Sequence, residues 1–133
     1  MNRHPYLRAY MAGTLIPTLM LLVILGGLIV AHSLYPMPVA IERAIVFPMA
    51  VVPNLWGLWN VLFHLRPRLP IGVHGALLPL LLVPCGLLLA GYFRIDVVPA
   101  RLALAFTPFG MAVYYLVWKH AVSYLNRTVG LRC

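Results

Sequence analysis

The sequence has very few acidic residues and little charge of any kind. Of its 133 residues, two are Asp or Glu and 9% are charged, whereas 63% are hydrophobic. Because Glu42 and Asp96 are the only acids, paired-carboxylate catalysis would require both at one site. The mean hydropathy of +0.95 exceeds what a soluble core of this length could bury. The composition therefore indicates a membrane protein.

Other signatures of chemistry are also missing. The two cysteines, Cys85 and Cys133, form no C-x-x-C pair, which argues against a thiol oxidoreductase. The sequence contains no glycine-rich phosphate loop. Ser33 and Ser123 have no neighbouring base and acid that would make either a nucleophile. We therefore expect neither an enzyme nor a bound cofactor.

Four long apolar runs predict an all-α membrane protein with four transmembrane helices in one compact bundle over residues 1–133. About 20 residues at about 1.5 Å each match the roughly 30 Å hydrocarbon core of a bilayer. A basic start before the first run resembles a signal peptide, but the run is too long and lacks an A-x-A-like cleavage site. We interpret it as an uncleaved anchor. The predicted spans are about 11–34, 41–63, 74–93 and 102–121.

Basic residues predict the orientation of the chain, because those in short loops stay on the cytoplasmic side. Arg43, Arg94 and Arg101 share one side with both acids. The other side has only basic residues, so we place both termini in the cytoplasm and the protein in a bacterial-type inner membrane. Anionic lipid headgroups are the expected partner of these charges, and scattered positives do not favour nucleic acid. The basic residues of the cytoplasmic side are Arg3, Arg8, Arg66, Arg68, Lys119, Arg127 and Arg132.

The chain aligns with itself at an offset of 62 residues without a gap. The G-x-L-x-P and F-x-M-A-V patterns recur, although Leu, Gly and Pro match by composition in any two spanning hairpins. A duplication predicts two parallel helical hairpins, 1–64 and 65–133, related by an axis along the membrane normal. The most informative pairs are Gly13 with Gly75, Pro17 with Pro79, Phe47 with Phe109, Met49 with Met111, and Trp56 with Trp118.

A polar stripe on the second span is the main candidate site. At 100° per residue these side chains share one face, whereas Trp59 falls on the opposite face, which we expect to contact lipid. The asparagines either hold helices together or line a ligand or ion pathway. The stripe comprises Trp56, Gly57, Asn60 and His64, with Asn54 at its edge. Thr14 and Thr18 form a matching stripe on the first span. The commoner outcome for such threonines is a hydrogen bond back to their own helix.

Two further groups of candidate site residues lie at the ends of the predicted spans. On the outer side, His32, Glu42 and Arg43 predict an ion pair or cap across the first hairpin, with proton or cation coupling as the alternative. On the cytoplasmic side, His64, His74 and His120 are a weak alternative for a metal or haem, since no two have close ligand spacing. We expect no metal. The pairs Gly27 with Ala31 and Gly86 with Ala90 would allow close helix crossings.

Three functions fit this pattern. The first is a non-catalytic accessory subunit of a membrane complex, or a homo-oligomer, because neither a soluble domain nor a catalytic constellation is evident. The second is a small dimeric transporter or channel protomer, suggested by the duplicated hairpin and by prolines within every span. The third is a membrane enzyme acting on a lipid or quinone.

Overall fold

The computed structural model describes residues 4–35, 41–93 and 99–131, without the side chains of residues 41–47 and 93. Within these ranges the regular structure is entirely helical. The elements are α1 (Pro5–Leu34), α2 (Ile41–Leu65), α3 (Ile71–Ala76), α4 (Leu78–Phe93), α5 (Ala100–Val117), the π-helical turn η1 (Trp118–Val122) and α6 (Ser123–Thr128).

Three helical stretches are long and apolar enough to cross a membrane: Pro5–Leu34, Ile71–Tyr92 and Ala100–Thr128. They extend beyond the predicted limits at the ends that carry polar residues. Pro5 fits the first turn of α1 because that turn needs no N–H donor. The last stretch ends where Gly130 adopts a φ of 79° and the N–H of Leu131 donates to the carbonyl of Asn126 at 2.8 Å. Hydropathy alone therefore placed the helix ends too far inside.

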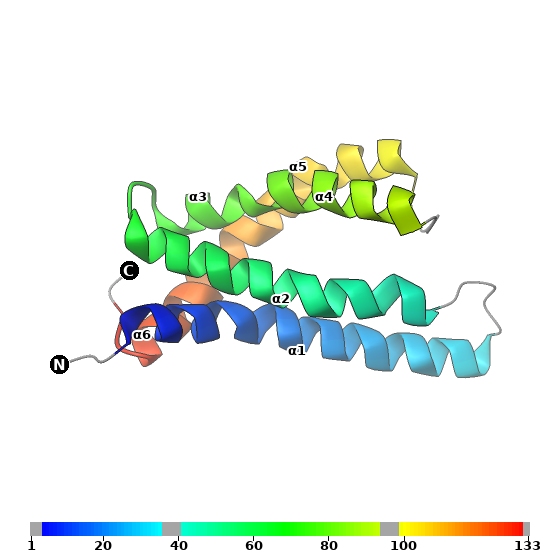
Figure 1. The fold of residues 1–133 in the computed structure, drawn as a ribbon, viewed down its shortest axis with the longest axis horizontal. Coiled ribbons are helices and arrows are strands. Elements are labelled where there is room, and N and C mark those ends of the chain that lie inside the picture. Colours follow the sequence, from blue (N-terminus) through cyan, green and yellow to red (C-terminus); the bar gives the residue numbers. More distant parts are fainter. Residues whose placement is uncertain (1–3, 36–40, 94–98, 132–133) are drawn as a thin grey trace.

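The helices form two layers, with α1 and α2 in one and α3, α4 and the start of α5 in the other (Figure 1). The start of α1 and the end of α6 lie at the same end of the molecule. At that end the layers contact each other, and towards the opposite end they diverge. The bundle is thus less compact than the sequence predicts.

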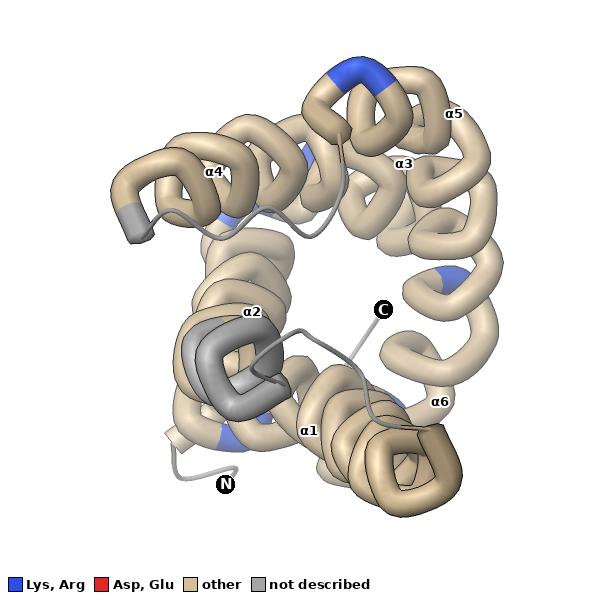
Figure 2. The backbone as a smooth tube through the Cα atoms, turned by 90° about the vertical axis from the view of Figure 1, so that its right-hand side faces the viewer, with Lys and Arg blue, Asp and Glu red and all other residues tan. Residues whose placement is uncertain are grey.

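The continuous helix formed by α5, η1 and α6 connects the two layers. Seen from the end where the layers diverge, it starts beside α4 and descends until α6 lies next to α1 (Figure 2). The π turn lies between α5 and α6, in the later part of this continuous helix, and π turns commonly occur as short insertions within α-helices. The crossing places residues from the last part of the chain against α1 and α2.

The core lies where the two layers meet. Its buried apolar side chains are Trp56 on α2, Leu78 on α4, and Trp118 and Val122 on η1. The helix is interrupted at Leu77, between α3 and α4, two residues before Pro79, whose ring cannot supply an N–H. Pro17 and Pro53, by contrast, are buried within uninterrupted helices.

Candidate functional site

A buried pair of amide side chains joins α2 to the last helix, α6. The Nδ2 of Asn60 donates to the Oδ1 of Asn126 at 2.8 Å, and the Nδ2 of Asn126 donates back to the Oδ1 of Asn60 at 3.0 Å. Asn60 Nδ2 also donates to the backbone carbonyl of Ala9 at 2.7 Å. Both asparagines have 0% exposure. Because buried amides are costly without partners, this arrangement fixes α1, α2 and α6 in one register.

Asn126 is the residue of the candidate site that the sequence analysis did not single out. It lies beyond the predicted end of the fourth span, next to Arg127. One signal pointed towards it. Asn60 lies near the C-terminal end of α2 and needs a polar partner, and Asn126 lies in α6, at the C-terminal end of the last helix.

An aromatic cluster adjoins the amide pair. The ring centroid of Trp56 lies 5.0 Å from that of Tyr114 and 5.5 Å from that of Trp118. These distances are typical of favourable aromatic contacts. The indole nitrogens of both tryptophans are buried and have no hydrogen-bond partner among the described residues. The cluster therefore stabilises the layer contact by packing of its rings.

Glycines make this packing possible. A Cβ atom on Gly75 would lie 2.0 Å from Cγ of Trp118, so only a hydrogen fits there. A Cβ atom on Gly13 would lie 2.7 Å from the backbone oxygen of Trp56 and 3.0 Å from Cα of Gly57. Both glycines therefore allow a neighbouring helix to approach at backbone distance.

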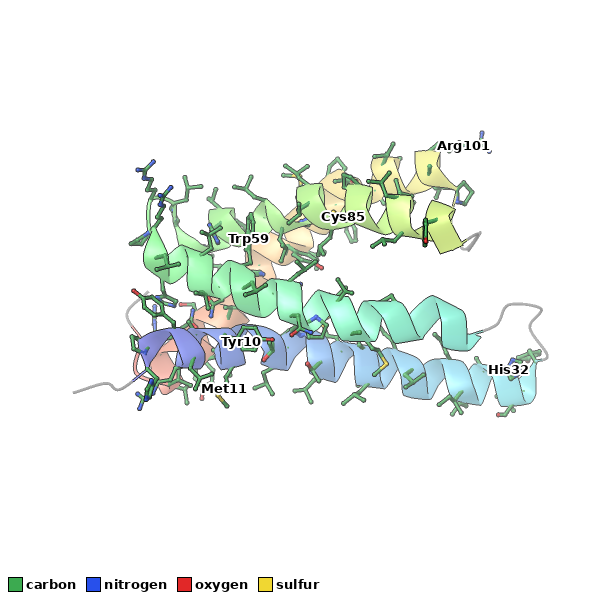
Figure 3. The ribbon with its side chains drawn as sticks, in the orientation of Figure 1. Tyr10, Met11, His32, Trp59, Cys85 and Arg101 are labelled. Atoms are coloured by element: carbon green, nitrogen blue, oxygen red, sulfur yellow. The ribbon has the colours of Figure 1, made fainter. Side chains whose placement is uncertain are left out.

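Trp59 connects α2 with α3, and the expectation that it contacts lipid is wrong. Its ring stacks on that of His74 at 4.9 Å, with 27° between the planes. Its Nε1 donates to the backbone oxygen of His74 at 2.9 Å, and Nε2 of His74 lies 3.1 Å from the oxygen of Trp59. Figure 3 shows Trp59 on the side of α2 that faces the other layer. A helical wheel with one inward face does not describe α2, since α2 packs against α1 and α3 on different sides.

The remaining polar side chains of the predicted stripe bond locally or to α1. Gly57 makes room for Tyr10, because a Cβ atom there would lie 2.6 Å from Cδ2 of the Tyr10 ring. The Tyr10 hydroxyl donates to Oδ1 of Asn54. The Thr14 hydroxyl donates to the carbonyl of Met11 at 3.0 Å, and that of Thr18 to the carbonyl of Thr14 at 2.7 Å, so both bond within their own helix.

Of the three histidines that the sequence offers as metal ligands, two adjoin the same aromatic ring and the third is exposed. His64 and His74 both contact the ring of Phe63, at centroid distances of 5.2 and 5.4 Å. His120 is exposed on η1. Nε2 of His64 is buried without a hydrogen-bond partner within the described part of the chain. Among the residues that the structure describes, no three His, Cys, Asp or Glu side chains group as a metal site requires.

The predicted outer-side pair stays a prediction. His32 is exposed near the end of α1, at the end of the molecule where Arg101 also lies (Figure 3). The side chains of Glu42 and Arg43 fall outside the described residues, as does Asp96.

Comparisons with family models, with curated proteins and with solved structures found no match to this chain.

Proposed function

We propose that the chain is an integral membrane protein of a bacterial-type inner membrane, with both termini in the cytoplasm. Large apolar side chains are exposed along its helices, including Val23 at 75%, Leu88 at 74% and Phe109 at 69%. A water-soluble monomer rarely exposes apolar surface continuously along several helices. Lipid or other apolar helices can cover these faces at no hydration cost. The three long apolar stretches and the 25-residue α2 together provide four spans, an even number that leaves both termini on one side.

We propose further that the fold consists of two tandem helical hairpins. Gly13 packs on the backbone of Trp56, and Gly75 packs on Trp118. Gly75 lies 62 residues after Gly13, and Trp118 lies 62 residues after Trp56. The pairs repeat elsewhere in the same register, because Tyr10 contacts Gly57 and Gly72 contacts Lys119. These matched contacts support the duplication independently of sequence identity.

The function that we propose is a non-catalytic interaction subunit of a membrane complex, or a homo-oligomer. The single observation that carries it is the division between a polar interior and an apolar exterior. Asn60 and Asn126, the buried amides, bond to each other and to the backbone of α1 within the chain. The exposed faces offer apolar contact area, which suits helix packing with a partner.

Association in a mild detergent tests this function. We expect affinity purification followed by native mass measurement to give a defined larger complex or a defined homo-oligomer. A strictly monomeric chain would overturn the proposal. An isolated dimer whose thermal stability rises with a particular solute would overturn it in favour of a transporter.

Glycine variants on α1 sharpen this test. Gly26 and Gly27 both have open space, with nothing within 4 Å of a Cβ atom, so leucine at either position leaves the fold intact. They differ by about 100° in direction around the helix. We expect Gly27→Leu to disrupt association by blocking the close approach that Gly27 and Ala31 allow, and the matched Gly26→Leu to retain it. Equal association in both variants would exclude this face of α1 as the contact.

A further inference from the structure

A pocket lies between the beginning of α3 and the stretch formed by η1 and α6. Its volume is about 540 Å³. Pro70 and Ile71 form one wall, and the opposite wall comes from one face of the last helix. The side chains on that face are Lys119, His120, Ser123, Tyr124 and Arg127.

This wall has the chemistry of an anion site. Lys119 and Arg127 carry permanent positive charges, and Ser123 and Tyr124 contribute hydroxyl groups. None of the described residues that line the pocket is acidic. Arg presents a planar fork of donors to phosphate oxygens, and Lys adds a point charge. A phosphate group is the anion that uses both kinds of donor.

The pocket is also at the depth of lipid headgroups if the last helix spans the bilayer. From Arg101 to Lys119 the helix rises about 27 Å, and to Arg127 about 39 Å, at about 1.5 Å per residue. With Arg101 at one interface, Lys119 lies near the opposite edge of the roughly 30 Å hydrocarbon core and Arg127 lies beyond it. The basic face therefore spans the layer that contains the phosphates.

The stem of Lys119 is held in position within the fold. A Cβ atom on Gly72 would lie 3.2 Å from Cβ of Lys119, so the backbone of α3 packs closely against the stem. The Nζ of Lys119 lies 5.6 Å from the centroid of the Tyr115 ring. The charge is thus supported from one side by an aromatic face and is open to the pocket on the other.

We propose that this pocket binds the phosphate of an anionic phospholipid headgroup, with Lys119 and Arg127 as the principal ligands. The proposal rests on the membrane location proposed above. It is more specific than general attraction of basic loops to the membrane, because it assigns binding to two of the basic residues and excludes others on the same side.

Arg66 and Arg68 provide a matched control. Both are exposed in the segment between α2 and α3, and neither lines the pocket. Sequence-based orientation places them on the same membrane side as Lys119 and Arg127. The variants R66Q/R68Q and K119Q/R127Q therefore remove the same net charge from the same side, and only the second removes it from the pocket.

The experiment is a native mass spectrometry titration of the purified chain with dioctanoyl phosphatidylglycerol. Dioctanoyl phosphatidylcholine and inorganic phosphate are the comparison ligands. We expect the wild type and R66Q/R68Q to bind phosphatidylglycerol with similar affinity, and K119Q/R127Q to bind about tenfold or more weakly. The charge-preserving K119R/R127K should recover most of the affinity. Thermal unfolding without lipid should be the same for all variants, because all four substituted side chains are exposed.

Three results would overturn the proposal. Equal weakening in the two glutamine variants would mean diffuse attraction. Equal affinity for phosphatidylcholine would remove the role of net charge, and equal affinity for inorganic phosphate would assign the pocket to the free ion. Each of these leaves the association test unaffected, whereas a chain that stays soluble without detergent would refute the membrane location itself.

Discussion

Replacing Asn60 by leucine should destabilise the protein by orphaning a buried amide. The variant removes three hydrogen bonds, one to Ala9 and two with Asn126. The Ala9 carbonyl can still accept within its own helix, but both polar ends of the Asn126 amide lose their partners at 0% exposure. An unsatisfied buried polar group costs about 1 to 3 kcal/mol. We expect Asn60→Leu to lower the free energy of unfolding by about 3 kcal/mol, with a similar effect for Asn126→Leu.

The double variant distinguishes this mechanism from a loss of packing. With leucine at both positions no amide is left unpaired, and two apolar groups of similar shape meet. The double variant should therefore cost no more than either single variant. The measurement is reversible unfolding by SDS in mixed micelles, followed by circular dichroism. Asn54→Leu is the control, because Asn54 is exposed and should cost about 1 kcal/mol or less.

A strictly additive result would refute the reasoning. If the costs of Asn60→Leu and Asn126→Leu sum in the double variant, the two amides are not coupled and their proximity has no energetic consequence. A single variant without any effect would mean that water or the detergent satisfies the remaining amide.

Substitutions at Gly75 and at Trp59 test the layer contact. Gly75→Ala should destabilise by about 2 kcal/mol because its methyl group would overlap Trp118, whereas Gly86→Ala, with open space around it, should be neutral or slightly stabilising in the same unfolding measurement. Trp59→Phe should lower the free energy of unfolding by about 1 kcal/mol through the lost hydrogen bond to His74. Trp59→Leu should lower it further because the ring stack is lost as well. Equal losses in the two variants would contradict a role for stacking.

The helical fold was largely predictable, because apolar runs of spanning length have few alternatives to a helix. The arrangement of those helices was not. A helical wheel assigned Trp59 to lipid, since it compares the polarity of faces and cannot count how many neighbours a helix has. On α2 the face opposite Asn60 also has a partner, and the Trp59 ring supplies the contact with His74.

The candidate site was predictable in half of its residues. Asn60 was evident because an amide in an apolar helix needs a hydrogen-bond partner. Asn126 was hidden because the next residue, Arg127, is charged and because η1 and α6 extend the last helix past the predicted boundary. Pairing across 66 residues depends on where the last helix crosses the layers, and composition carries no information about that crossing.

The separation of the two asparagines along the chain has a consequence for biosynthesis. Asn60 leaves the ribosome 66 residues before Asn126. At about 5 to 20 residues per second, Asn60 waits roughly 3 to 13 seconds before its partner has been made. With the membrane location proposed above, the first hairpin would enter the bilayer while Asn60 bonds only to the Ala9 carbonyl and its Oδ1 still lacks the Asn126 donor. The last turn of the last helix thus completes the assembly, and a nascent chain truncated before Asn126 would remain in the intermediate state.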